Sequence, residues 1–234
     1  MNRRDYFAVL GIGIAGTAGC TSIPTGFDPT ESEPTESNEL IRETYEGDGS
    51  ALNEFSVENE GAILFEVESD DRLSADVIPA DEDGSGTAFT IESRLSRIRK
   101  YSDIETGEYA LDVTTNGEWK IIIEQHPPLG LKSVETPEFP LTISSETPDV
   151  FGPYNFDGFM SASTYSTAVS GLNFIDESGE WVESVGHGQT HLGETRDQGT
   201  INVEGPHWLV VTMNLALTGD DDPVEFEVTL EAPS

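Results

Sequence analysis

The chain has 234 residues, with 45 aspartate and glutamate residues against 11 lysine and arginine residues, so its formal net charge is −34. This charge repels polyanions and disfavours direct binding of nucleic acid. It also opposes compaction in dilute buffer, whereas at about 1 M salt the Debye length is only ~3 Å and the repulsion nearly vanishes. The composition is therefore typical of a halophile's protein that folds in concentrated salt.

Residues 1–19 have the pattern of an export signal. Arg3 and Arg4 precede a glycine-rich apolar stretch, residues 6–19, that is shorter than the roughly 20 apolar residues of a transmembrane helix. The only cysteine of the chain, Cys20, follows directly. We expect cleavage before Cys20 and lipidation of its thiol, which would anchor the protein in the cytoplasmic membrane. The alternative is a secreted protein without lipid.

The leader also carries a resemblance. Arginines 3 and 4 followed by Asp5, Tyr6 and Phe7 resemble the twin-arginine export signals of haloarchaeal lipoproteins, and the residues up to Cys20 resemble a lipobox. This resemblance implies a location on the extracellular face of the membrane. Because Cys20 is the only cysteine, we expect no disulfide and no cysteine-bound metal in a monomer.

Residues 20–42 contain three prolines among serines, threonines and acidic residues. Such a composition cannot bury an apolar core. We therefore expect a disordered tether that separates the folded part from the membrane.

Beyond the tether the chain divides into two stretches of similar layout, residues 43–127 and 136–232, joined by a short linker, residues 128–135. In each stretch, short apolar runs alternate with acidic or glycine-containing turns, and a tryptophan leads a later run. This spacing favours antiparallel β-sandwich modules of jelly-roll or immunoglobulin-like type. We therefore predict an all-β chain with two tandem modules related by an internal duplication.

In the first module, every second side chain of residues 63–67 is apolar, which indicates a half-buried strand. Asn116 and Gly117 stand between two such runs, and this pair is a strong signal for a β-hairpin. We expect the hairpin to lead into a strand that starts near Trp119.

In the second module, residues 172–175 are expected to form a strand that runs into an acidic turn. Gly205 and Pro206 are expected to form a turn before a strand led by Trp208, and residues 226–230 a last strand. We expect both leading tryptophans to be core residues.

Residues 107–125 resemble a β-sandwich repeat of haloarchaeal surface proteins. The resemblance implies a sandwich fold. It carries no catalytic residue.

An acidic loop in the first module has the ligand order of an EF-hand. Asp81, Asp83 and Ser85 supply oxygen ligands, and Glu92 stands at loop position 12. Apolar residues at positions 91, 95 and 98 have the spacing of an exiting helix. The loop could bind Ca²⁺; the alternative is an ordinary acidic loop between strands, and then no cofactor is expected.

His187 and His191 are four residues apart, and Glu194 follows. On a helix, two imidazoles at this spacing share one face and could bind Zn²⁺. The neighbouring glycines favour a polar loop instead. A metal-dependent hydrolase or accessory subunit centred on these histidines is one alternative function.

Four basic side chains lie within seven residues and could bind an anionic sugar or polymer. They are Arg94, Arg97, Arg99 and Lys100. The alternative is that they pair with neighbouring acids on a sheet face.

The chain contains no Gly-x-Ser-x-Gly nucleophile motif. We therefore expect a non-enzymatic surface protein that binds an extracellular ligand or an envelope component. A second alternative is the solute-capturing lipoprotein of a transporter, which the absence of alternating β and α units disfavours.

Overall fold

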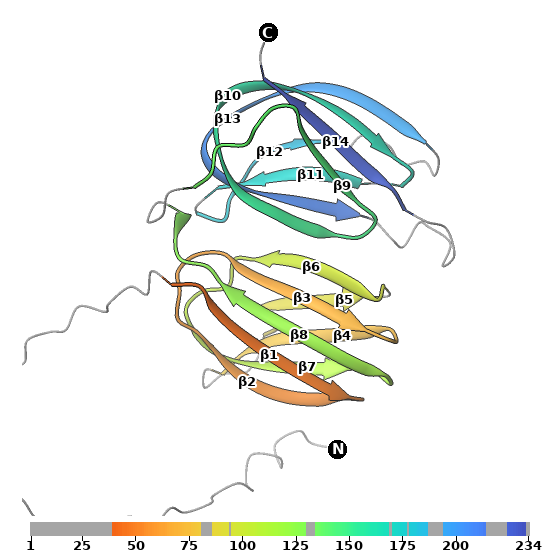
Figure 1. Ribbon diagram of the computed structural model, residues 1–234. Coiled ribbons are helices and arrows are strands. Elements are labelled where there is room, and N and C mark those ends of the chain that lie inside the picture. The colour runs from red at the N-terminus through yellow and green to blue at the C-terminus, as the bar shows by residue number, and fades with distance from the viewer. Residues whose placement is uncertain are drawn as a thin grey trace, which may run out of the picture. The chain divides into compact units, whose positions relative to one another are not determined.

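The computed structural model describes residues 39–80, 86–93, 95–129, 134–168, 170–176, 178–186, 194–213 and 224–232. Within these ranges every regular element is a β-strand, and the strands form three antiparallel sheets (Figure 1). The described part of the chain contains no helix that is long and apolar enough to span a membrane. The all-β prediction is confirmed.

The first module is an eight-stranded jelly roll. Its two sheets have the strand orders β1-β8-β3-β6 and β2-β7-β4-β5, so the chain repeatedly crosses from one sheet to the other. The strands are β1 (Ile41–Asp48), β2 (Ala51–Val57), β3 (Ile63–Ser69), β4 (Leu73–Pro79), β5 (Phe89–Ser93), β6 (Arg97–Ser102), β7 (Gly107–Thr114) and β8 (Glu118–Gln125). The first strand begins two residues before the predicted module boundary at residue 43.

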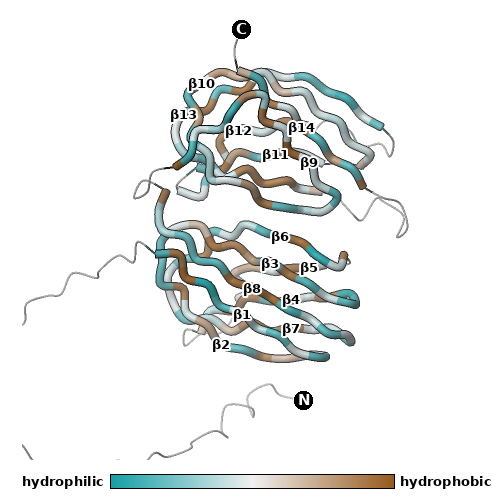
Figure 2. The backbone as a smooth tube through the Cα atoms, viewed as in Figure 1, coloured by the Kyte–Doolittle hydropathy of each residue, from teal (hydrophilic) through white to brown (hydrophobic). Residues whose placement is uncertain are grey.

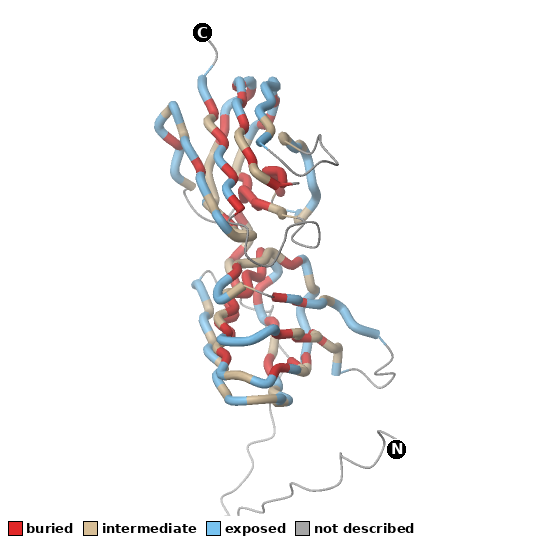
Figure 3. Tube along the Cα trace, turned by 90° about the vertical axis from the view of Figure 1, so that its right-hand side faces the viewer, coloured by how far each residue is buried: buried red, intermediate tan, exposed pale blue. Residues whose placement is uncertain are grey.

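The alternation of apolar and polar residues explains these strands. Successive side chains of a strand point to opposite faces of the sheet, so Ile63, Phe65 and Val67 of β3 all reach the core and are fully buried. Figure 2 shows this alternation along the tube as changes between brown and teal, and Figure 3 shows it as changes in burial.

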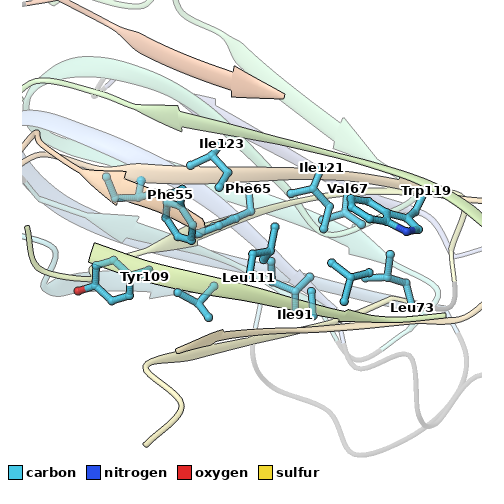
Figure 4. Close-up of a cluster of buried hydrophobic side chains, with 14 of the residues drawn as sticks. Phe55, Phe65, Val67, Leu73, Ile91, Tyr109, Leu111, Trp119, Ile121 and Ile123 are labelled. Carbon is cyan, nitrogen blue, oxygen red and sulfur yellow. The ribbon is translucent and has the colours of Figure 1, made fainter. Parts of the chain in front are cut away.

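The core of the first module is filled from both sheets (Figure 4). Phe55 packs edge-on against Phe65 and is stacked on Tyr109, with ring centroids 6.3 and 5.6 Å apart. Trp119 is 4% exposed, and its indole N–H donates to the carbonyl of Gly49 at 2.8 Å. The predicted core position of Trp119 is confirmed.

The predicted hairpin at Asn116 and Gly117 is wrong. The strands on either side, β7 and β8, belong to different sheets and do not pair. Gly117 N–H donates to the hydroxyl of Thr115, and its carbonyl accepts from the N–H of Gly49. These contacts hold an arch between the sheets. The chain does reverse at the asparagine–glycine pair, but in the jelly-roll topology the next strand, β8, lies in the opposite sheet.

The second module is one six-stranded antiparallel sheet with the order β12-β11-β13-β10-β14-β9. Two long strands bend in mid-course, and the sheet thereby folds over its own core (Figure 1). The strands are β9 (Leu141–Ser145), β10 (Asp149–Ser166), β11 (Ser170–Ile175), β12 (Trp181–Val185), β13 (Thr195–Met213) and β14 (Phe226–Glu231).

Glycines with positive φ lie within both long strands. The pairing of β10 with β13 shifts register between Phe151 and Tyr154, where Gly152 has φ +97°. In β13, Gly205 has φ +92°, a backbone conformation that residues with a β-carbon rarely adopt. The predicted turn at Gly205 and Pro206 is therefore wrong, because β13 bends there and continues.

The two modules are not copies of one fold, so the expected internal duplication is not seen in the strand order. The tryptophans that suggested it occupy different places. Trp119 lies in the core of the first module, whereas Trp208 lies in a separate apolar cluster.

That cluster contains residues of both modules, namely Ala62, Leu64, Leu129, Val150, Ile175, Trp208 and Val210. Trp208 is 2% exposed, and Leu129, which belongs to the predicted linker, is 6% exposed. The ring of Trp208 also makes an edge contact with His126, with centroids 4.8 Å apart. Apolar burial thus couples the modules as well as stabilising each one.

Arg99 adds polar contacts to this junction. Its backbone N–H donates to the carbonyl of Pro148 at 3.0 Å, and its Nη1 donates to the carbonyl of Val150 at 2.9 Å. The guanidinium also lies 3.3 Å from a carboxylate oxygen of Glu124 and 3.9 Å from one of Asp149. Burial raises the pKa of Asp149, and the Val150 N–H and Arg99 offset part of this rise.

Candidate functional site

One sheet surface of the second module carries mostly neutral polar side chains. We call this surface the polar face and define it as the outward side chains of β9, β14 and the adjoining halves of β10 and β13. Its members are Thr142, Ser144, Asp157, Phe159, Ser161, Ser163, Tyr165, Arg196, Gln198, Thr200, Asn202, Glu204, Glu227, Thr229 and Glu231.

The strand pattern explains why these side chains share a face. In residues 156–166 of β10, every second residue is buried, so the core takes Met160 and Ala162 while Phe159 and Tyr165 point outward. Phe159 is 61% exposed. An exposed aromatic ring on a polar sheet surface is available for contact with a ligand.

Two rows of side chains cross the four strands of the polar face. The first row runs through Thr142, Thr229, Ser163 and Gln198, and the second through Ser144, Glu227, Tyr165 and Arg196. Neighbouring strands lie about 4.8 Å apart, so each row spans roughly 15 Å. Thr142 and Thr229 are joined through their hydroxyl oxygens at 3.2 Å.

The two rows border a hollow of about 520 Å³. Its lining comprises Ser163, Thr164, Tyr165, Arg196, Asp197, Gln198, Glu227 and Thr229. The guanidinium carbon of Arg196 lies 5.3 Å from the centroid of the Tyr165 ring, which is a cation–π contact. Burial and the charges of Glu194 and Glu225 raise the pKa of the Tyr165 hydroxyl, so this group stays a neutral donor at ordinary pH.

The outer face of β1-β8-β3-β6 is different, because its basic side chains are already paired with acids. The pairs are Arg42–Glu124, Arg97–Glu66, Arg99–Glu124 and Lys120–Glu68. A hollow of about 780 Å³ lies over this sheet, and carboxylates such as Glu46, Asp48 and Asp70 are prominent in its lining. The side chains of Arg42, Arg97 and Lys120 are 54%, 60% and 41% exposed, so solvent screens these pairs.

The predicted cationic cluster does not form a single patch in the described residues. Arg97 and Arg99 point outward from β6, whereas Lys100 lies opposite Phe65 on the core side. Burial lowers the pKa of Lys100, and the charge of Glu92 counteracts this. Arg94 lies outside the described residues.

Asp81, Asp83 and Ser85 of the predicted Ca²⁺ loop also lie outside the described residues. Glu92 is exposed on β5, where it pairs across the sheet with Ser74. The exiting helix expected from the apolar spacing is wrong, because Ile91 lies on β5, Ile98 on β6 and Leu95 in the bend between these strands. The apolar side chains at these positions pack in the core between the two sheets, and this packing explains their spacing.

His187 and His191 lie outside the described residues, and Glu194 is exposed just before β13. Arg3, Arg4 and Cys20 of the leader lie outside them as well. The part of the chain that is described contains no group of three or more histidine, cysteine or acidic residues arranged to hold a metal ion.

A third hollow, of about 330 Å³, lies beside the junction of the modules and is bordered by Tyr101, Asp103 and Gly179. Burial, with the charges of Asp103 and Asp176, raises the pKa of Tyr101 to about 12. In the adjoining turn, the N–H and the hydroxyl of Ser178 both donate to the carboxylate of Asp176. The described residues that line this hollow include no lysine, arginine or histidine.

No family model and no curated protein matches the chain. Among solved structures, it is similar to the M60 catalytic domain with the CBM51-1 and CBM51-2 domains from Clostridium perfringens ZmpB. The identity is 7% and the TM-score 0.24, over 80% of this chain and 34% of that one. The chain thus spans about a third of that protein, and the likeness adds nothing to the description of the site.

Sequence reasoning missed the polar face, although two signals were visible. Between Phe159 and Tyr165, the outward positions are all serine, which is a neutral pattern in a very acidic chain. Arg196 is the only lysine or arginine in residues 136–232. Neither signal identifies a site until strand pairing places Tyr165 opposite Arg196.

Proposed function

We propose that this protein is a non-enzymatic, lipid-anchored surface protein of a halophile that binds a glycan on the polar face of its second module. The observation that carries the proposal is the neutral row that crosses four strands, together with two outward aromatic rings on β10. The outer face of β1-β8-β3-β6, in contrast, carries ion pairs and acidic side chains.

The chemistry of the polar face suits a polyhydroxylated polymer. Serine, threonine, asparagine and glutamine side chains donate and accept hydrogen bonds, as sugar hydroxyls do. Tyrosine offers a large rigid surface at a low cost in conformational entropy, and surfaces that combine it with small polar residues are adaptable binding surfaces. The C–H face of a sugar ring can pack on Tyr165 while its hydroxyls contact Ser163 and Gln198.

An extended ligand fits the layout better than a compact one. Phe159 and Tyr165 are six residues apart on one strand, so their positions are separated by roughly 20 Å. The cross-strand rows span a comparable width. A polymer could contact both aromatic residues, whereas a single small molecule could contact only one.

Substitution of the aromatic residues tests the binding surface. Tyr165→Ala and Phe159→Ala should each weaken binding to immobilised polysaccharides in molar KCl, and the double variant should weaken it further. Trp181→Ala is the matched control, because Trp181 is also an exposed aromatic residue (66%) but lies on β12, outside the polar face. Equal loss in the control, or full binding by the double variant, would reject the polar face as the site.

The location is tested separately. We infer from Arg3, Arg4 and Cys20 that the protein is exported and lipidated, with the tether holding the modules away from the membrane. Cys20→Ser should release the protein into the medium, whereas Arg3→Lys together with Arg4→Lys should retain it in the cell. Membrane retention of the Cys20→Ser protein would contradict the lipid anchor.

A further inference from the structure

We infer that the glycan bound by the polar face is acidic and that Arg196 recognises its carboxylate or sulfate group. This inference rests on the proposed function and adds the class of ligand and the residue that selects it. The starting observation is the position of Arg196. Arg196 is the only lysine or arginine in residues 136–232, and it lies in the hollow of the polar face.

Arg196 forms no ion pair within the described residues, although the chain is rich in acids. Four other described basic side chains on the outer face of β1-β8-β3-β6 each have a carboxylate within 4.0 Å. Arg196 instead stacks over Tyr165. In its row, Glu227 lies on the far side of Tyr165, so one whole strand separates the two charges.

The stacked position leaves the guanidinium ready for an anion. An arginine fork presents parallel N–H donors that match the two oxygens of a carboxylate or sulfate. Contact with an aromatic ring restrains the side chain through its face, while the N–H groups at its edge stay available. Ser163 and Gln198 are directly adjacent on the same face and can bind the hydroxyls of the same sugar unit.

The arrangement also sets the orientation of the ligand. Glu227 and Arg196 occupy opposite sides of Tyr165. Asp197 of β13 also lines the hollow, so attraction of an acidic substituent depends on direct contact with the Arg196 guanidinium, which lies away from Glu227. A sugar stacked on Tyr165 should therefore direct its acidic group toward β13. A neutral sugar has no such preference.

Salt decides whether an acidic polymer can approach at all. With a net charge of −34, the protein repels polyanions at long range in dilute buffer. In molar salt the repulsion is screened beyond about 3 Å, but a direct arginine–carboxylate contact persists because it is shorter-ranged. Binding of the acidic polymer should therefore strengthen with salt, opposite to the usual weakening of electrostatic complexes.

The test compares polymers that differ in charge and share a backbone. The probes are polygalacturonate with its methyl ester, and dextran sulfate with dextran, each immobilised and titrated with protein in molar KCl. Wild-type protein should bind at least one acidic polymer about tenfold more tightly than its neutral partner, as expected for hydrogen bonds to a charged group. The two pairs distinguish a carboxylate from a sulfate.

Arg196→Gln should abolish the preference while leaving the weaker binding of the neutral polymer. Arg72→Gln is the matched control, because Arg72 is exposed, has no ion pair in the described structure and lies in the first module. An unchanged urea midpoint of Arg196→Gln would show that the fold is intact.

The inference is overturned if wild-type protein shows no preference for an acidic polymer, if Arg196→Gln keeps the preference, or if Arg72→Gln loses it equally. In those cases binding that depends on Tyr165 would still support the proposed function. Absence of binding to all four polymers would count against the proposed function as well.

Discussion

The two tryptophans provide a sharp test of the packing, because they are equally buried but differ in hydrogen bonding. Trp119 is 4% exposed and donates to the carbonyl of Gly49 at 2.8 Å. Trp208 is 2% exposed, and its indole nitrogen has no hydrogen-bond acceptor among the described residues. Substitution by phenylalanine removes the indole N–H at both sites and leaves an aromatic ring.

The loss of apolar area should be similar at the two sites. Tryptophan to phenylalanine removes roughly 40 Å² of buried surface, which corresponds to about 1 kcal/mol of unfolding free energy. At Trp119 the lost hydrogen bond adds about 1 kcal/mol, so Trp119→Phe should cost about 2 kcal/mol. At Trp208, removal of a buried donor without an acceptor regains about 1–3 kcal/mol. Trp208→Phe should therefore be neutral or stabilising.

Urea denaturation in molar KCl, followed by far-ultraviolet circular dichroism, measures both free energies under conditions that screen the surface charge. The expected difference between the two variants is at least about 2 kcal/mol. Equal losses at the two sites, or a greater loss for Trp208→Phe, would refute the reasoning that hydrogen bonding distinguishes them.

Three further outcomes are expected. Arg99→Gln should lower the unfolding free energy by about 2 kcal/mol, because it removes charged hydrogen bonds at the module junction. Arg97→Gln should cost less than about 1 kcal/mol, because the Arg97 side chain is exposed and solvent screens its ion pair with Glu66. Similar losses in urea melts would contradict the role of the junction. Asp112→Asn should raise the unfolding free energy by about 0.2–1 kcal/mol in dilute buffer and leave it unchanged in molar KCl, because Asp112 lies directly opposite Asp76. Glu108→Gln on the same strand is the control. A gain that persists in salt would exclude charge repulsion as its cause. Burial would raise the pKa of Asp176, but hydrogen bonds from Ser178 and Glu180 outweigh this effect and lower the pKa. The carboxylate therefore contributes stability above pH 3.8 that is lost as the pH falls toward the lowered pKa. Asp176→Asn should flatten this loss in acid titrations of the unfolding free energy, and an unchanged slope would contradict the assignment.

The strands themselves could be predicted from the sequence, because period-two alternation follows directly from the geometry of a half-buried sheet. Residues 63–67 and 226–230 form strands as expected. The pairing of the strands could not be predicted in the same way. Asn116 and Gly117 favour a reversal of the chain, and a reversal within one sheet and an arch between two sheets have the same local sequence.

The bend in β13 shows a similar limit. Gly205 and Pro206 read as a turn, since glycine with a positive φ is common in turns. In this fold the positive φ of Gly205 bends a long strand over the core, and Trp208 continues the same strand. Only the buried residues on both halves of the folded sheet, such as Ile201 and Leu209, distinguish the two outcomes.

The candidate site was harder to predict than the fold. Metal-ligand motifs in loops have a recognisable spacing, as at His187 and His191. The polar face has no such motif, since Thr142, Ser163, Gln198 and Thr229 meet only through strand pairing. Residues distant in sequence that share one sheet surface leave no short-range pattern.

The apolar cluster at the junction restricts how this architecture can evolve. Ala62 and Leu64 of the first module are shielded by Trp208 and Val210 of the second. Loss or exchange of either module would expose an apolar surface on the remaining one. This surface would be prone to self-association in concentrated salt, which strengthens apolar contacts. The two modules should therefore be inherited as a unit, and recombination that separates them should be selected against.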